Sequence, residues 1–154
     1  MGIKSFQGAR EEVKKEYNAP ILVEDYMTKN LVTFTPQQSI LNVMELFLKH
    51  RISGGPVIDE KGNLVGIISE ADCMKQISES RYFNMPILDK SVEKYMSKSV
   101  ETIPHDTSIF DAASTFYKNN RRRLPVTQNG RLVGQISRKD LVVAALKLQS
   151  MNWK

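Results

Sequence analysis

The chain contains two short segments in which a carboxylate follows a serine by three residues. They are Ser69-Glu70-Ala71-Asp72 and Ser137-Arg138-Lys139-Asp140. This spacing is typical of a helix N-terminus, where the serine and the acidic residue cap free backbone N–H groups and complement the helix dipole. A carboxylate in the first turn of a helix can also accept hydrogen bonds from a bound ligand. The pattern by itself leaves both interpretations open.

Three consecutive arginines, Arg121 to Arg123, stand directly before the apolar segment Leu124-Pro125-Val126. Guanidinium groups bind phosphate well, particularly beside a helix N-terminus that offers free N–H groups. The alternative is a solvated helix end, because cations near a helix C-terminus are stabilising in any case. A nucleic-acid groove is disfavoured, since the run is short and has no interleaved aromatic residues for stacking.

Both groups of residues belong to an internal repeat. VEDYMTKN at residues 23–30 aligns with VEKYMSKS at residues 92–99, and GNLVGIISEAD at 62–72 aligns with GRLVGQISRKD at 130–140. Each copy predicts a short extended segment, a helix, two β segments joined by a glycine-containing turn, and a second helix. The sequence therefore predicts an α/β fold of the α+β type, built from two tandem β-α-β-β-α repeats.

The repeat divides the chain into five parts. They are a helical N-terminal extension (1–20), repeat 1 (21–78), a linker (79–88), repeat 2 (89–148) and a tail (149–154). A unit of about 60 residues buries too little surface to be comfortably stable alone. We expect the two repeats to pack on one another with pseudo-twofold symmetry and to leave a cleft where equivalent loops meet.

The first helix of each repeat carries apolar residues at i, i+3, i+4, i+7 and i+8, which predicts one buried stripe. The stripe runs from Ile40 to Leu48 in repeat 1 and from Ile109 to Tyr117 in repeat 2.

Charge is distributed unequally between the repeats. Residues 89–148 carry 11 basic and 6 acidic residues, a net +5, whereas residues 21–88 carry 6 basic and 8 acidic, a net −2. Repeat 1 has Ser53 and Gly54 where repeat 2 has Arg122 and Arg123, so the fold does not require the arginines. One side of the predicted cleft should be positive.

The order and spacing of these motifs resemble the CBS domain, named after cystathionine β-synthase. The shared pattern is M-T/S-K, a threonine before the first helix, G/R-x-P-V, and G-x-L-V-G-x-I-S-x-x-D, twice over from residue 21 to about 148. A tandem pair is called a Bateman module. The resemblance implies binding of AMP, ADP, ATP or another adenosyl ligand between the repeats, and regulation of a partner protein. It also implies a stand-alone module that forms a homodimer and acts on its effector in trans.

The resemblance also implies roles for individual residues. Asp140, and by repetition Asp72, would accept hydrogen bonds from the ribose hydroxyls. Arg122 and Arg123, with Lys139 as a third cation, would reach the phosphates, whereas Arg121 would face solvent. Gly54 removes the equivalent cation from repeat 1, so one of the two sites is expected to be weak or empty.

The resemblance further implies that an apolar slot for adenine is lined by Thr33, Thr102, Ile103 and Pro125. The alternative interpretation of these four residues is ordinary packing. The predicted ligand-binding residues are together Thr33, Ser69, Asp72, Thr102, Ile103, Arg122, Arg123, Pro125, Ser137, Lys139 and Asp140.

Catalysis and metal binding find no support in the sequence. His50 and His105 are not at equivalent positions of the repeat, neither has metal-ligand spacing with Cys73, and no phosphate-binding loop of the GxxxxGK[ST] type occurs. We therefore expect no enzyme activity, no metal site and no catalytic cofactor, only a regulatory adenine nucleotide.

The single cysteine and the short apolar runs predict a cytoplasmic protein with no membrane contact. Two alternatives remain open. One is a basic module that binds nucleic acid or an acidic protein through Arg121 to Arg123. The other is a ligand-free structural dimer in which the S-x-x-D segments serve only as helix caps.

Overall fold

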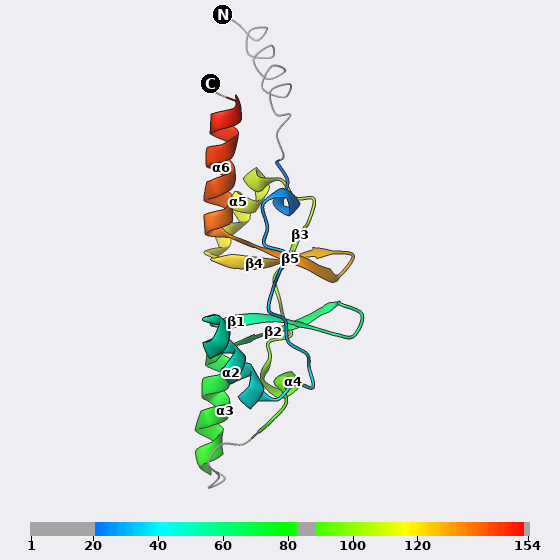
Figure 1. Ribbon diagram of the computed structural model, residues 1–154, viewed down its shortest axis with the longest axis vertical. Coiled ribbons are helices and arrows are strands. Elements are labelled where there is room, and N and C mark those ends of the chain that lie inside the picture. The colour runs from blue at the N-terminus through cyan, green and yellow to red at the C-terminus, as the bar shows by residue number, and fades with distance from the viewer. Residues whose placement is uncertain (1–20, 83–88, 153–154) are drawn as a thin grey trace, which may run out of the picture. The chain divides into compact units, whose positions relative to one another are not determined.

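The computed structural model describes residues 21–82 and 89–152, which form two compact units (Figure 1). Unit 1 comprises residues 21–28, 103–126 and 134–152 of the described chain, and unit 2 comprises residues 29–102 and 127–133. The predicted helical extension at residues 1–20 and most of the predicted linker lie outside the described residues. The units cut across the sequence repeats, and each is described separately below.

Unit 2 is a β-hairpin covered by helices. Its elements are α2 (Ile40–His50), β1 (Gly54–Ile58), β2 (Leu64–Ser69), α3 (Glu70–Tyr82) and α4 (Val92–Tyr95). The strands β1 and β2 are antiparallel, with Gly54 opposite Ser69, and Phe34 adds a parallel bridge to Val57. The buried core is formed by Phe34, Ile40, Val43, Phe47, Val57, Ile68, Cys73 and Val92.

Unit 1 contains a three-stranded sheet with helices packed on it. Its elements are η1 (Val23–Asp25), β3 (Ile103–Pro104), α5 (Ile109–Asn119), β4 (Arg123–Gln128), β5 (Arg131–Ser137) and α6 (Arg138–Asn152), with strand order β3-β4-β5. The outer ends of β4 and β5, residues 127–133, belong to unit 2. Asn129 and Gly130 join these strands in left-handed conformations, as a two-residue hairpin turn requires.

The first long helix of each repeat has the same start and stop signals. Ser39 Oγ accepts a hydrogen bond from the N–H of Asn42 at the start of α2, and Ser108 Oγ accepts one from Asp111 at the start of α5. The helices are followed by the C-cap residues Arg51 and Asn120, which adopt left-handed conformations with φ of 55° and 51°. The predicted α+β class and the β-α-β-β-α order are confirmed, although the first β segment of repeat 1 is only the Phe34 bridge.

The opening segment of each repeat packs with elements of the other repeat. In unit 1, bridges join Leu22 to Ser108 and Thr28 to Gln135. In unit 2, the corresponding bridges join Ser91 to Ser39 and Ser97 to Ile67. Val23 and Val92, which open the two repeats, are both fully buried.

A glycine in the L-V-G motif allows this exchange of opening segments. A Cβ on Gly134 would lie 2.5 Å from Met27 Sδ and 2.9 Å from the carbonyl oxygen of Thr28. In unit 2, a Cβ on Gly66 would lie 2.7 Å from Met96 Sδ and 2.9 Å from the carbonyl oxygen of Ser97. In each unit the M-T/S motif therefore packs directly against the glycine of the L-V-G motif. A side chain at that glycine would hold the two segments apart.

The predicted apolar stripes are wrong at two positions. At i+4, Met44 is half-buried and Ala113 is exposed. Leu48 and Tyr117, at i+8, are 80% and 89% exposed, because the buried face of each helix is narrower and includes only positions i, i+3 and i+7. No helix in residues 21–82 or 89–152 has the length and apolar character needed to cross a bilayer.

Candidate ligand-binding site

The segment Ser137 to Asp140 forms a reciprocal cap at the start of α6. The N–H of Ser137 donates to Asp140 Oδ2 at 2.9 Å, and the N–H of Asp140 donates to Ser137 Oγ at 3.2 Å. The capping interpretation is thus confirmed. Within the described chain no hydrogen bond reaches Asp140 Oδ1, and the residue is half-buried. One carboxylate oxygen holds the helix start, and the other remains available.

Unit 2 repeats this cap with nearly the same geometry at the start of α3. The N–H and hydroxyl of Ser69 donate to Asp72 Oδ2 at 2.8 and 3.0 Å, and the N–H of Asp72 lies 3.4 Å from Ser69 Oγ. The caps therefore do not distinguish the two repeats. Any difference between two ligand sites must come from the residues around them.

The arginine loop, defined as Asn120 to Arg123, joins α5 to β4. Its start is fixed by a hydrogen bond from the N–H of Arg121 to the carbonyl oxygen of Phe116 at 3.1 Å. The N–H of Arg138 donates to the carbonyl oxygen of Arg122 at 3.0 Å, which ties the loop to the first residue of α6. The loop and the Asp140 cap therefore lie at the same end of α6.

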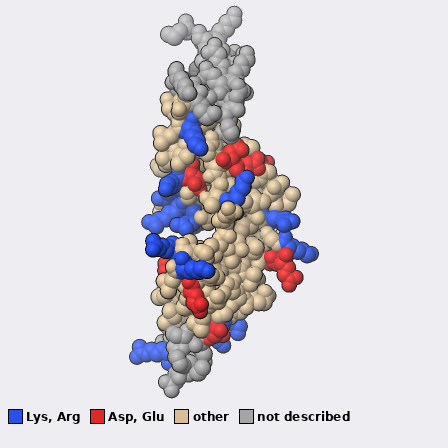
Figure 2. Space-filling model, viewed as in Figure 1, with Lys and Arg blue, Asp and Glu red and all other residues tan. Residues whose placement is uncertain are grey.

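Basic side chains gather at this end of unit 1. Arg121, Arg122, Arg123, Arg138 and Lys139 are all exposed. On the face shown in Figure 2, lysine and arginine side chains collect over the beginning of β4 and of α6. The positive charge predicted from the composition of repeat 2 is thus concentrated beside the Asp140 cap.

The equivalent strand start in unit 2 is closely packed around two glycines. A Cβ on Gly55, the counterpart of Leu124, would lie 2.7 Å from the ring of Phe34. A Cβ on Gly54, the counterpart of Arg123, would lie 3.0 Å from the carbonyl oxygen of Ile68. Phe34 stands where unit 1 has the smaller Ile103, so the large ring in unit 2 takes the volume that Leu124 fills in unit 1.

The predicted adenine-slot residues are divided between the units. Ile103 in β3 and Pro125 in β4 are buried in unit 1. Thr33 and Thr102 belong to unit 2, where Thr102 lines a pocket of about 230 Å³ together with Lys98 and Val100. Seven of the eleven predicted residues thus lie in unit 1 and four, Thr33, Ser69, Asp72 and Thr102, lie in unit 2.

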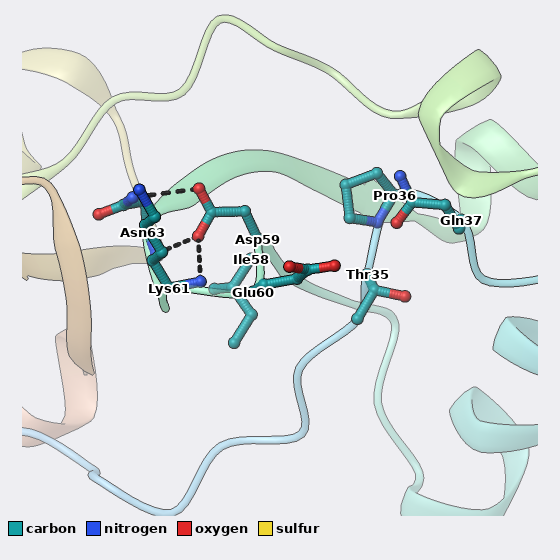
Figure 3. A pocket seen from close by; sticks show the side chains of 8 residues that line it. All are labelled: Thr35, Pro36, Gln37, Ile58, Asp59, Glu60, Lys61 and Asn63. Carbon is teal, nitrogen blue, oxygen red and sulfur yellow. Dashed lines mark hydrogen bonds between the residues drawn. The ribbon is translucent and has the colours of Figure 1, made fainter.

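A larger pocket, of about 550 Å³, lies in unit 2 between the loop Thr35 to Gln37 and the β1–β2 turn (Figure 3). None of the predicted ligand residues lines it. In the sequence this turn of repeat 1 differs from that of repeat 2 by one additional residue, because the offset between the repeats falls here from 69 to 68. Asp59 accepts hydrogen bonds from the N–H groups of Lys61 and Asn63, both at 2.9 Å, and from Asn63 Nδ2 at 3.1 Å. The pKa of Asp59 is held below its usual value mainly by the hydrogen bond from the backbone N–H of Asn63, and next by the one from its side chain. The hydrogen bonds of this carboxylate therefore stabilise the turn.

Two other reactive side chains, Cys73 and His105, are respectively buried and paired with a carboxylate. Cys73 is 2% exposed, and its burial, with smaller effects from the Asp72 and Glu70 charges, raises the pKa of its thiol. His105 Nδ1 lies 2.7 Å from Glu24 Oε2 in unit 1. Among the described residues, no group of three or more histidine, cysteine, aspartate or glutamate side chains has an arrangement that would hold a metal ion.

Comparison with known proteins gives a consistent result. The CBS domain model matches residues 23–79 and residues 92–147. The protein MJ1426 of Methanocaldococcus jannaschii is 32% identical over 155 residues, which cover 82% of this chain and 92% of the relative.

Two solved structures resemble this fold and hold adenosine-containing ligands. CBSX2, a CBS-pair protein from Arabidopsis thaliana, in complex with AMP has a TM-score of 0.71 and 31% identity, covering 84% of this chain and 99% of the other. The CBS domain pair of protein MJ0100 in complex with 5′-methylthioadenosine and S-adenosyl-L-methionine has a TM-score of 0.65 and 29% identity, covering 83% and 98%.

Proposed function

We propose, since this chain belongs to the CBS domain family and carries two tandem copies of the domain, that it is a regulatory module for an adenine nucleotide. The observation that carries the proposal is the position of Asp140 Oδ1. Among the described residues this oxygen is free, and it lies at the N-terminal end of α6, the same end to which the arginine loop is hydrogen-bonded. A carboxylate acceptor and a group of cations at one helix N-terminus suit the sugar hydroxyls and the phosphate of a nucleotide.

The ligand is held as follows. Asp140 Oδ1 accepts hydrogen bonds from the ribose hydroxyls while Oδ2 keeps the cap with Ser137. Arg122 and Arg123 bind the phosphate, with Lys139 as a further cation, and Ile103 and Pro125 lie around the base. The AMP complex of CBSX2 and the S-adenosylmethionine complex of MJ0100 support an adenosyl ligand, and the cations favour AMP, ADP or ATP.

A second, weaker site is formed around Thr33, Ser69 and Asp72. Its cap geometry matches that of Asp140, but Ser53 and Gly54 stand where repeat 2 has Arg122 and Arg123, so the phosphate-binding cations are missing from these positions. This site therefore binds adenosine without a strong preference for the phosphorylated form.

The module has no catalytic role and acts as a cytoplasmic homodimer on an effector protein in trans. Support for a self-associating surface comes from the helices of both units. Leu48 of α2 and Tyr117 of α5, which are equivalent in the repeat, are both strongly exposed, and so are Met74 of α3 and Val142 of α6.

Thermal unfolding in the presence of AMP, ADP, ATP, S-adenosylmethionine and NAD tests the proposal. A ligand that binds only the folded state, present at 100 times its Kd, stabilises the protein by roughly 2.7 kcal/mol. We expect the phosphorylated adenine ligands to raise the melting temperature. If none of the five does so, the nucleotide proposal is wrong, and binding of nucleic acid or of an acidic protein would then be measured.

Asp140→Asn separates the ligand role from the cap. The amide oxygen can still accept the N–H of Ser137, but the amide nitrogen that takes the other position cannot accept a ribose hydroxyl. We expect a nearly unchanged melting temperature without ligand and a reduced ligand-induced shift. Asp72→Asn is the matched control in unit 2 and should keep the shift given by AMP. An unreduced shift in Asp140→Asn would contradict the ribose assignment.

A further inference from the structure

We propose that Arg138 is a positioning residue that holds the arginine loop in place for an anionic group, an inference that rests on the proposed function. Its Nε donates to the carbonyl oxygen of Arg121 at 2.5 Å, and its Nη2 donates to Asn120 Oδ1 at 3.0 Å. Its backbone N–H donates to the carbonyl oxygen of Arg122 at 3.0 Å. One residue thus contacts three consecutive residues of the loop.

These contacts assign Arg138 a role that its charge alone did not indicate. The guanidinium is a rigid planar fork, and two of its donors are directed at acceptors of the loop. The side chain therefore faces the loop that carries Arg122 and Arg123. A lysine at this position would keep the charge, but its single ammonium group does not reproduce the fork that spans the carbonyl of Arg121 and the side chain of Asn120.

The arginine loop needs such a support because of its own composition. It carries three adjacent cations, with Lys139 following Arg138 on α6, and like charges so close together repel one another. The loop also begins in the left-handed conformation of Asn120. Arg138 attaches to neutral acceptors, so it fixes the backbone beneath Arg122 and Arg123 without neutralising them. A loop fixed before binding loses less conformational freedom when the anion arrives.

Unit 2 provides an internal comparison. Glu70 replaces Arg138 at the start of α3, and its N–H still donates to the carbonyl oxygen of Ser53 at 2.9 Å. In the described residues of unit 2, no hydrogen bond joins the Glu70 carboxylate to the loop before β1. The backbone bond is thus a property of the fold, whereas the guanidinium contacts occur only in the unit that carries the arginines.

Limited trypsin digestion tests the positioning without any ligand. Mass spectrometry would give the rates of cleavage after Arg121, Arg122 and Arg123 in the wild type, Arg138→Lys and Arg138→Gln. We expect cleavage in this loop to accelerate severalfold in both variants, and to stay unchanged in Glu70→Gln, the matched control in unit 2. Because Arg138 is exposed, both variants should fold. Wild-type cleavage rates in Arg138→Lys would overturn the proposal.

Titration calorimetry with adenosine and with AMP measures the consequence for the anion. The Kd of adenosine divided by the Kd of AMP reports the contribution of the phosphate to binding. In Arg138→Lys we expect this ratio to fall about two- to tenfold, the scale of one side chain's ordering, while the Kd of adenosine is unchanged. A ratio kept in Arg138→Lys and lost in Arg138→Gln would show that Arg138 supplies charge only, and would overturn the proposal.

The two measurements separate this inference from the proposed function. If wild-type protein binds AMP no better than adenosine, the phosphate assignment of Arg122 and Arg123 is wrong, and no anion is left for Arg138 to serve. Faster loop cleavage in Arg138→Lys would then still show that Arg138 holds the loop. Unchanged cleavage beside a normal preference for AMP would leave the proposed function standing and overturn the role of Arg138.

Discussion

At the scale of single residues, the buried face of α3 is unexpectedly polar. Its inward positions are Cys73, Gln76 and Ser80, where α6 of unit 1 has Leu141, Ala144 and Leu148. Gln76 is fully buried, and neither polar atom of its side chain has a hydrogen-bond partner. A buried polar group without a partner costs about 1–3 kcal/mol of stability. Gln76 therefore weakens unit 2 at the face where α6 stabilises unit 1.

Replacing Gln76 by leucine should stabilise the protein, because it removes two unpaired polar atoms and keeps most of the side-chain volume. We expect the free energy of unfolding to rise by about 1–3 kcal/mol in urea denaturation. Lys75→Leu, on the exposed side of the same helix, is the control and should change it by less than about 0.5 kcal/mol. A loss of stability in Gln76→Leu would show that the amide makes contacts beyond those described.

The residue-level predictions that succeeded are those with a local cause. The caps of Ser69 and Ser137 follow from spacing along one helix turn, and a sequence carries that spacing directly. The direction of the Arg138 side chain was not predictable, since its acceptors on Asn120 and Arg121 are 18 and 17 positions earlier in the chain. The unpaired state of Gln76 depends on what surrounds α3, which no local pattern records.

At the scale of elements, two glycines determine whether the opening segment of each repeat can reach its partner strand. Gly134 admits the backbone of Met27 and Thr28 to the edge of β5, and Gly66 admits Met96 and Ser97 to β2. The same pair of motifs therefore joins two elements in each unit. These contacts involve a backbone carbonyl oxygen as well as the methionine sulfur. The methionine side chain could move away from a methyl group added at the glycine, but the backbone oxygen could do so much less.

Gly134→Ala should destabilise unit 1, because the added methyl group would overlap Met27 Sδ and the carbonyl oxygen of Thr28. We expect a loss of about 1–3 kcal/mol in the free energy of unfolding. Combining it with Met27→Ala removes the sulfur but leaves the backbone oxygen. The double variant should therefore lose less than the sum of the two single variants in a denaturation cycle. Simple additivity would mean that the contact is unimportant.

The helices and hairpins were predictable, but the exchange of opening segments was not. Periodicity identifies an element from its own residues, as for α2, α5 and the Asn129-Gly130 turn. A repeat shows that Val23 and Val92 are equivalent, yet it does not say with which copy each of them packs. The error at Leu48 and Tyr117 has a related cause, since the width of a buried stripe depends on what covers the helix.

At the scale of the whole molecule, apolar residues remain exposed at equivalent positions of both units. Single exposed apolar residues are ordinary. Here α5 and α6, which contact one another, expose Phe110, Tyr117, Val142 and Leu146 by 53%, 89%, 58% and 66%. A set of this size on two adjoining helices suits an interface with a second copy of the chain, as the proposed homodimer requires.

Tyr117→Arg combined with Leu146→Arg should therefore shift the protein from dimer to monomer, since each arginine would place a charge in an apolar contact. Light scattering coupled to size-exclusion chromatography gives the molar mass directly. Glu93→Arg, an exposed change on α4, is the control and should stay dimeric. A wild type that is monomeric at all concentrations, or a double variant that remains dimeric, would remove these helices as the interface.

The exchanged opening segments also constrain how the protein is made. Thr28 pairs with Gln135, so the earliest described part of the chain meets its partner strand only after more than a hundred further residues have left the ribosome. Repeat 1 likewise gains Val92, a member of its core, only once synthesis of repeat 2 has begun. The core residues of unit 2 are therefore all present once residue 92 has been made, whereas the opening segment of unit 1 meets its partner strand only when residue 135 follows. The nascent chain is most exposed to aggregation and proteolysis in that interval.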